Sequence, residues 1–297
     1  MSQAMQVGNP LKGVGLVTLA VMLFAVSDVA TKHLTMLYAV PLVVVLRYLV
    51  NLLLLLAVYL PRQGRAVFVT QRTGLVLLRA GCLAAASLTM GLALRYMPVA
   101  ETVAIVYLAP VLVVILGKSI LHEKVNWLGW AGVLCGFAGV LVIMRPGAGL
   151  DPVGVALCLV NAVFGAGYHL LSRVLSRTET TPALLIYTAG VGVIAFAVML
   201  LWSGVGTLPQ GVDWLWLLAL GVVATLGHFL FTAAYREAPA SLLAPVNYLH
   251  LVWAGILGWL VFDHAPDALS MTGMGLVAVA GITVALRSHF GRPEDTA

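Results

Sequence analysis

The stretch LRYMPVAETVAIVYL at 94–108 returns in altered form as YREAPASLLAPVNYL at 235–249. The aligned pairs include Arg95 with Arg236, Pro98 with Pro239, and Tyr107 with Tyr248. The shift between the copies is 141 residues, close to half of the 297-residue chain. A segment that occurs once in each half predicts that the chain consists of two related halves.

The composition indicates that lipid surrounds most of the chain. Apolar residues make up 62% of the sequence and charged residues only 9%, whereas soluble domains carry about 25% charged residues. The net charge is +5, but no Lys/Arg cluster is interleaved with aromatic residues, so we expect no nucleic-acid partner. Cys82, Cys135 and Cys158 each lie in an apolar run without CxxC spacing, so we expect no disulfide, metal site or cofactor.

Apolar segments of spanning length occur throughout the chain. A membrane-spanning helix needs roughly 20 mostly apolar residues, and short polar breaks divide the chain into ten such segments. The sequence therefore predicts an all-α integral membrane protein with ten transmembrane helices. The predicted spans are 13–33, 40–60, 74–94, 98–119, 126–145, 152–172, 182–202, 213–235, 239–261 and 268–287.

The basic residues in the loops predict an orientation. One side holds Lys12, Arg62, Arg65, Arg72, Lys118, Lys124, Arg173, Arg177, Arg236, Arg287 and Arg292. The other side holds Lys32, Arg95 and Arg145. Because cytoplasmic loops are enriched in Lys and Arg, this bias places both termini in the cytoplasm. We expect a multi-pass protein of the inner (plasma) membrane.

The repeat and the span count together predict an inverted-topology architecture. Residues 1–146 and 147–297 would each contain five spans. Because five is odd, the second half enters the membrane from the side opposite to the first. Many secondary transporters are built in this way and bind their solute near the midplane, between the halves. We therefore expect a lipid-embedded protein with a small-molecule metabolite as its partner, and the sequence leaves a homodimer open.

Several stretches resemble the drug/metabolite transporter superfamily, in particular its ten-helix group built from two EamA domains. They are PLVVVLRYLVNLLLLL at 41–56, the segment 93–146 with Glu123 and a glycine-rich helix, and its degenerate copy at 233–286 with Asp263. The resemblance covers nearly the whole chain. It implies a carrier of small metabolites, often amino acids, with export common.

Four ionisable residues near the outer ends of the spans are candidates for a gate or charge pair. Asp28 and Lys32 share one face of the first span, and Arg47 enters the second span at similar depth. They would form either a structural pair of Asp28 with Arg47 or Lys32, or a charged anchor for the solute. Glu101 lies in the first turn of the fourth span, where a carboxylate favours a helix N-terminus. A role in proton coupling or in binding a substrate amine is the alternative.

Polar side chains deeper in the spans are candidates for solute binding. They are Tyr107, Asn161, Tyr168, His228, Asn247, Tyr248, His250 and Trp253. Polar residues within lipid must face protein or water, so these residues predict either a central cavity or hydrogen bonds between helices. His228 and His250 titrate in a range that would suit proton coupling, or they serve as hydrogen-bond partners.

Prolines and glycines predict local features of the helices. Pro110 and Pro245 lie inside the fourth and ninth predicted spans, where each frees a backbone carbonyl and favours a kink. The stretch GWAGVLCGFAGVLV at 129–142 spaces its glycines so that another helix can approach closely.

The sequence favours a secondary transporter for small amphipathic metabolites, amino acids first, working by export or facilitated diffusion. An efflux pump for lipophilic cations is the alternative, and Asp28 or Glu101 would supply its carboxylate. A membrane-embedded enzyme would need a nucleophile–base pair or a metal triad, and no HExxH, GxSxG or carboxylate pair occurs. A Walker-type phosphate loop is also lacking, which argues against ATP-driven pumping by this chain.

Overall fold

The structure, a computed structural model, describes residues 9–109, 111–113, 115–116, 127–145, 149–175, 178–204, 206–237, 243 and 246–290. These residues form α-helices and one short 3-10 helix, with no β-strand among them. The elements are α1 (Pro10–Leu37), α2 (Val40–Gln63), η1 (Gly64–Phe68), α3 (Thr73–Tyr96), α4 (Val99–Val106), α6 (Trp127–Ile143), α7 (Pro152–Leu175), α8 (Thr181–Ser203), α9 (Asp213–Glu237), α11 (Leu249–Phe262) and α12 (Ala268–Phe290). The prediction of an all-helical protein is confirmed for the described residues.

Among the described residues, six helices are long and apolar enough to cross a membrane: α1, α2, α3, α7, α8 and α9. The remaining helices contain shorter apolar segments. Helix α2 begins at Val40 and α8 at Thr181, within one residue of the predicted starts at 40 and 182. Hydrophobic side chains on the outer faces of these helices, such as Leu201 and Trp202, remain exposed, as expected for surfaces that face lipid.

The fourth and ninth predicted spans differ from the expectation of continuous helices. Helix α4 ends at Val106, with Tyr107 as its C-cap, instead of running to 119. Pro110 carries no N–H group, so it cannot donate the usual helical bond to the carbonyl of Val106. Helix α11 begins only at Leu249, with Tyr248 as its N-cap. Pro110, Pro245, Lys118, Glu123 and Lys124 lie outside the described residues.

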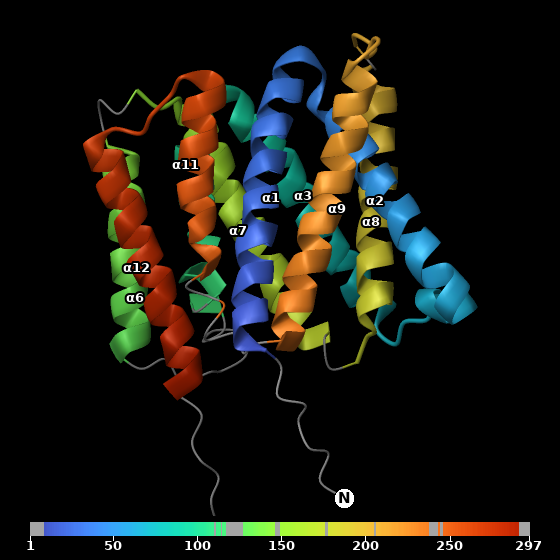
Figure 1. The fold of residues 1–297 in the computed structure, drawn as a ribbon, viewed down its shortest axis with the longest axis horizontal. Helices are drawn as coiled ribbons and strands as arrows, with labels where there is room; N and C mark the ends of the chain where they lie inside the picture. The colour runs from blue at the N-terminus through green and yellow to red at the C-terminus, as the bar shows by residue number, and fades with distance from the viewer. Residues whose placement is uncertain are drawn as a thin grey trace, which may run out of the picture.

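The two halves of the chain interleave. Helix α1 packs on α9, α3 on α7, α2 on α8, and α6 on α12. In Figure 1, α12 lies beside α6 at one edge of the bundle, and α2 lies near α8 at the other. The starts of α2 and α8, Val40 and Thr181, are 141 residues apart, as are those of α6 and α12, Trp127 and Ala268. The packing pattern therefore follows the sequence repeat: α1–α9 corresponds to α7–α3, while α2–α8 and α6–α12 each join a helix to its own counterpart.

Glycines permit the close approach of α6 and α12. A Cβ atom added at Gly139 would lie 2.7 Å from the carbonyl oxygen of Gly273, and one added at Gly273 would lie 2.7 Å from the carbonyl oxygen of Gly139. Gly136 is similarly close to Val111 and Ala280. The packing role predicted for the glycines of 129–142 is confirmed for Gly136 and Gly139.

Helix ends identify the two ends of the bundle. Helix α1 begins and α12 ends at the same end, which we call the proximal end; it is at the bottom of Figure 1. At the opposite, distal end, Lys32 of α1 contacts the carbonyl of Met97, which follows α3. The first turn of α7 is there too, because a Cβ atom on Gly154 would lie 2.4 Å from Cγ of Met97. The start of α7 thus lies at the same end as the finish of α1.

Candidate functional site

The two interrupted helices meet in the middle of the bundle. The rings of Tyr107, at the end of α4, and Tyr248, at the start of α11, have centroids 5.1 Å apart. The Tyr107 hydroxyl donates to the backbone carbonyl of Asn247 at 3.0 Å and lies 3.2 Å from Nδ1 of His250. Asn247 is helical and Tyr248 is a turn residue, so the Tyr107 hydroxyl binds a backbone carbonyl at the break between two helical segments.

Asp28 of α1 pairs with a histidine from the other half of the chain. One carboxylate oxygen of Asp28 lies 3.0 Å from Nε2 of His250, and their side chains are only 16% and 11% exposed. The expected pairing of Asp28 with Lys32 or Arg47 is not found among the described residues. Nε2 of His250 faces Asp28 of α1, and Nδ1 faces Tyr107 at the end of α4. His250 therefore joins α1 and α4 to α11.

Lys32 contacts backbone carbonyls at the end of α3. Its Nζ donates to the carbonyls of Leu94 and Met97, at 2.7 and 2.6 Å, and lies 5.4 Å from the ring centre of Phe262. These carbonyls belong to the last turn of α3 and the residue after it, where a cation is favoured by the helix dipole. Lys32 thus closes the distal end of α3.

Aromatic side chains surround the Asp28–His250 pair. The ring centroid of Phe24, one turn before Asp28 on α1, lies 4.8 Å from that of His228 on α9 and 6.3 Å from that of His250. His228 is itself exposed. Together these residues form what we call the central cluster: Phe24, Asp28, Tyr107, His228, Tyr248 and His250.

Arg47 of α2 supplies a second charge near the central cluster. Its guanidinium lies 5.4 Å from the ring centre of Tyr48. No carboxylate lies within ion-pair distance of Arg47 in the part of the chain that the structure describes. Arg47 follows the start of α2 by seven residues, and Asp28 precedes the end of α1 by nine. At 1.5 Å per residue, both lie roughly 10–14 Å from the distal end.

The other four predicted binding residues are not members of the central cluster, although Asn247 contacts it through its backbone carbonyl. The Asn161 amide of α7 donates to the carbonyl of Ala86 in α3, so it links two helices. Tyr168 of α7 binds Arg79 of α3. Trp253 of α11 packs in a cluster with Val17 of α1, and its indole nitrogen is buried without a hydrogen-bond partner among the described residues.

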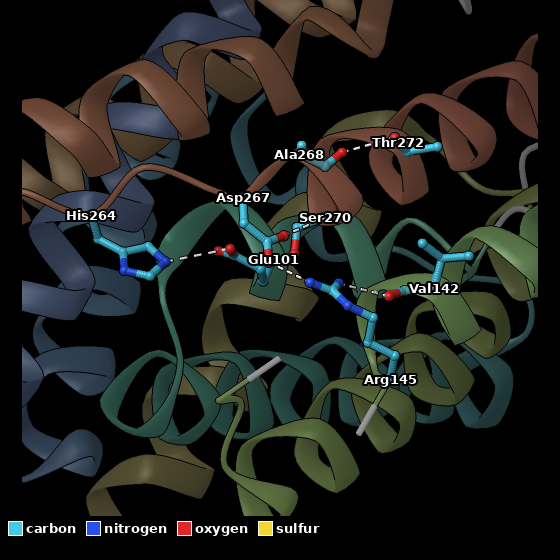
Figure 2. A network of polar contacts seen from close by, with 8 residues as sticks. All are labelled: Glu101, Val142, Arg145, His264, Asp267, Ala268, Ser270 and Thr272. Carbon is cyan, nitrogen blue, oxygen red and sulfur yellow. Dashed lines mark hydrogen bonds and ion pairs between the residues drawn. The ribbon is translucent and has the colours of Figure 1, made fainter. Parts of the chain in front are cut away.

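Glu101 takes part in a polar network at the distal end, shown in Figure 2. It lies in the first turn of α4, as predicted, is only 3% exposed, and is 3.4 Å from Nε2 of His264 in the α11–α12 loop. Nearby, Arg145 after α6 forms an ion pair with Asp267 before α12. The backbone N–H of Ser270, together with Arg145, holds the pKa of Asp267 below its ordinary value. The network ties α4, α6 and the α11–α12 loop together above the central cluster.

The surface of the described residues has hollows away from the central cluster. One follows the lipid-facing side of α8 from Ala195 to Ser203, and another lies between Met144 and Leu159 at the distal end. In this conformation the residues of the central cluster contact one another.

The repeat in the chain corresponds to a known family pattern. The pattern of the EamA-like transporters matches residues 11–145 and, a second time, residues 152–287. The chain belongs to the EamA-like transporter family. As a multi-pass membrane protein of this family, it is a transporter of small molecules.

Relatives of this EamA-like transporter include proteins named for different solutes. The riboflavin transporter of Brucella anthropi is 29% identical over 265 residues, which cover 87% of this chain and 93% of the relative. The pseudopaline exporter of Pseudomonas aeruginosa is 28% identical and covers 92% of this chain and 95% of the relative. A crystal structure with 23% identity covers 93% of this chain and 96% of its own, with a TM-score of 0.64, and supports the fold.

Sequence reasoning missed one intramembrane residue of this EamA-like transporter. Arg79 of α3 is only 4% exposed and binds side chains of α7 and α8. Its partners lie 89 or more residues away in sequence, so the apolar run around it gave no sign of them. The available signal was the charge itself, since an arginine within a predicted span requires polar partners.

Proposed function

We propose that this EamA-like transporter moves small amphipathic zwitterions, amino acids first among them, by alternating access. The observation that supports the proposal most is the central cluster, where two interrupted helices meet beside a buried carboxylate. The carboxylate of Asp28 would bind the ammonium group of the solute, which would replace His250 as its partner. Arg47, at similar depth and without a carboxylate partner among the described residues, would receive the carboxylate group.

The apolar part of the solute would contact the aromatic residues of the cluster. Phe24, Tyr107 and Tyr248 present ring surfaces next to Asp28 and His250. Aromatic faces bind apolar groups, while the tyrosine hydroxyls and the imidazoles offer hydrogen bonds. This mixture of groups suits a solute with one charged end and one apolar end, so it favours amino acids over lipophilic cations that lack a carboxylate.

Alternating access would follow from an inverted-topology repeat. Residues 1–146 and 147–297 would be the two five-helix units, related by an axis in the membrane plane. The interleaved packing of α1–α9 and α3–α7, with the start of α7 at the distal end, supports this relation. The proximal end would face the cytoplasm of a bacterial inner membrane, because Arg62, Arg65 and Arg72 lie at or beyond the end of α2.

The test is counterflow in proteoliposomes. Vesicles containing the purified transporter are loaded with each of the twenty amino acids and mixed with the same amino acid in radioactive form. We expect at least one amphipathic amino acid to be exchanged. We also expect transport, by export or facilitated diffusion, to proceed without an imposed gradient of another ion. A thermal unfolding transition would first show that the purified protein is folded. If such protein exchanged none of the twenty amino acids, the proposal would be contradicted.

The matched variants are Asp28→Asn and Asp263→Asn. The second changes an exposed aspartate in the α11–α12 loop, where asparagine tolerates the left-handed backbone with a φ of 54°. Both changes remove one negative charge. Counterflow lost in the first variant and kept in the second would support the assignment of Asp28 to the solute.

A further inference from the structure

Arg79 forms a polar junction between three helices near the proximal end. Its Nε donates to Ser172 at 2.6 Å, its Nη1 to Thr188 at 2.8 Å and to the carbonyl of Leu184 at 3.2 Å, and its Nη2 to the Tyr168 hydroxyl at 2.8 Å. Four of the five guanidinium N–H groups are therefore bound. The acceptors belong to α7 and α8, whereas Arg79 belongs to α3, so this one side chain holds the three helices together.

All of these acceptors are neutral. The Tyr168 ring adds a cation–π contact at 4.3 Å, but no carboxylate lies within ion-pair distance of Arg79 in the described ranges. A carboxylate binds a guanidinium through two parallel charge-assisted hydrogen bonds, which are stronger than bonds to hydroxyls. The junction is therefore stable in the absence of an anion, yet an anion could displace its neutral acceptors.

The repeat gives the junction around Arg79 a counterpart in the other half of the bundle. The 141-residue shift places Thr188 on Arg47 and Ser172 on Thr31, so the α3–α7–α8 junction corresponds to a junction of α9, α1 and α2. Each junction contains one arginine, carried by a different helix. Arg79 makes four hydrogen bonds, whereas the Arg47 guanidinium lies over the Tyr48 ring. The two arginines are therefore in different states in this conformation.

We propose that Arg79 keeps the α3–α7–α8 junction closed and that the carboxylate of the transported solute releases it. This inference rests on the proposed alternating access between the two ends. When α3 separates from α7 and α8, Arg79 loses its neutral acceptors within an apolar layer, where an unpaired guanidinium is strongly disfavoured. A solute carboxylate replaces them, so opening of this end depends on an anionic group. Arg79 thereby selects carboxylate-bearing solutes at the end opposite to Arg47.

A native cysteine makes closure of the junction measurable. A Cβ atom added at Gly167 of α7 would lie 3.3 Å from Sγ of Cys82 in α3, with no other atom among its nearest neighbours. Cys82 is one helical turn from Arg79, and Gly167 is next to Tyr168. Gly167→Cys, in a protein with Cys135→Ala and Cys158→Ala, is therefore expected to form a disulfide with Cys82 under a mild oxidant only while α3 and α7 are together.

The first arm of the experiment uses no solute. The rate of disulfide formation is measured in nanodiscs for the Gly167→Cys protein and for the same protein carrying Arg79→Gln, Arg79→Lys or Arg95→Gln. We expect Arg79→Gln to slow cross-linking about tenfold, because several hydrogen bonds to a charged group are lost, and Arg79→Lys to have an intermediate effect. Arg95 is exposed on the same helix and serves as the matched control. Equal rates with Arg79→Gln and Arg95→Gln, in proteins of equal thermal stability, would overturn the proposal.

The second arm adds a mixture of free amino acids or a mixture of the corresponding amino-acid amides. The amides keep the ammonium group and the side chain but lack the carboxylate. We expect the free amino acids, and not the amides, to slow cross-linking when Arg79 is present, and neither mixture to act on Arg79→Gln. Equal effects of the two mixtures, or no effect of either, would refute the carboxylate-dependent release. The proposed function is tested separately, because counterflow of an amino acid does not depend on the cross-linking result.

Discussion

Tyr38 and Glu179, 141 residues apart, secure the starts of two corresponding helices from equivalent loops. The Glu179 carboxylate, in the α7–α8 loop, accepts the backbone N–H groups of Gln71 and Arg72 just before α3. The Tyr38 hydroxyl, in the α1–α2 loop, donates to the carboxylate of Asp213 at the start of α9. The shift that relates Tyr38 to Glu179 also relates Arg72 to Asp213, so the two contacts are equivalent in position although their chemistry differs.

The Glu179 contact leads to a stability prediction. Glu179→Ala leaves two backbone N–H groups before α3 without their carboxylate, and the loss of an N-terminal cap costs about 0.5–2 kcal/mol. We expect thermal unfolding, followed with a thiol-reactive dye in detergent, to shift to lower temperature. Glu179→Gln keeps one acceptor oxygen and should shift it less. Identical unfolding of both variants and the parent protein would show that the contact is dispensable.

The Asp28–His250 pair predicts energetic coupling between two distant positions. Asp28→Asn and His250→Gln should each reduce counterflow of the transported amino acid by about tenfold or more, since each change removes one partner of a largely buried polar contact. The double variant should be little worse than either single variant, because both changes disrupt the same interaction. Fully additive losses would mean that the two residues act independently.

The α6–α12 crossing predicts a steric effect at one glycine. Gly139→Ala brings a methyl group to within 2.7 Å of the Gly273 carbonyl, and overpacking of this kind typically costs about 1–3 kcal/mol. Gly255→Ala is the matched control, because no atom lies within 4 Å of a Cβ atom at Gly255. We expect only Gly139→Ala to lower the unfolding temperature. A destabilised Gly255→Ala variant would instead indicate a general intolerance of helix substitutions.

The exposed Lys12–Glu237 pair predicts a pH dependence. Lys12 donates to Glu237 at 2.6 Å, and the backbone N–H of Asn9 donates to the same carboxylate at 3.2 Å. These bonds hold the pKa of Glu237 below its ordinary value of 4.5. A lowered carboxyl pKa stabilises the folded state above the unfolded pKa, and this contribution is lost as the pH falls through the folded pKa.

The corresponding measurement compares the unfolding temperatures of the parent protein and Glu237→Gln across pH. Near neutral pH the parent should be the more stable protein, and the difference should disappear below about pH 4. Because the pair is exposed, added salt should also reduce the difference. A difference that grows on acidification would contradict the assigned direction of the pKa shift.

The proposed orientation predicts a labelling pattern. Arg65→Cys, in η1 at the proximal end, should react with a membrane-impermeant maleimide only after cells are permeabilised. Leu208→Cys, in the exposed α8–α9 loop at the distal end, should react in intact cells. The reverse pattern would place the termini outside the cytoplasm.

Much of the fold could be predicted from the sequence because lipid exposure leaves long apolar segments, such as α2 and α8. The interruption at Tyr107 could be predicted only in part. Pro110 indicated a freed carbonyl, but the hydrogen bond from Tyr107 to the Asn247 backbone joins residues 140 positions apart. The partners of Asp28 and Arg79 were missed for the same reason. Spacing along one helix favoured Lys32 as the partner of Asp28, whereas tertiary packing placed His250 closer.

The glycine crossing of α6 and α12 has a mechanical consequence. Helix α6 and helix α12 are counterparts in the repeat, and they contact each other. If the two halves exchanged conformations, the geometry of the α6–α12 contact would therefore stay the same. The same holds for α2 and α8 at the other edge. Under the proposed alternating access, the pairs α1–α9 and α3–α7 would instead exchange conformations, one pair opening as the other closes. The edges would then act as stationary pivots, and the motion of a transport cycle would be concentrated in the four helices between them.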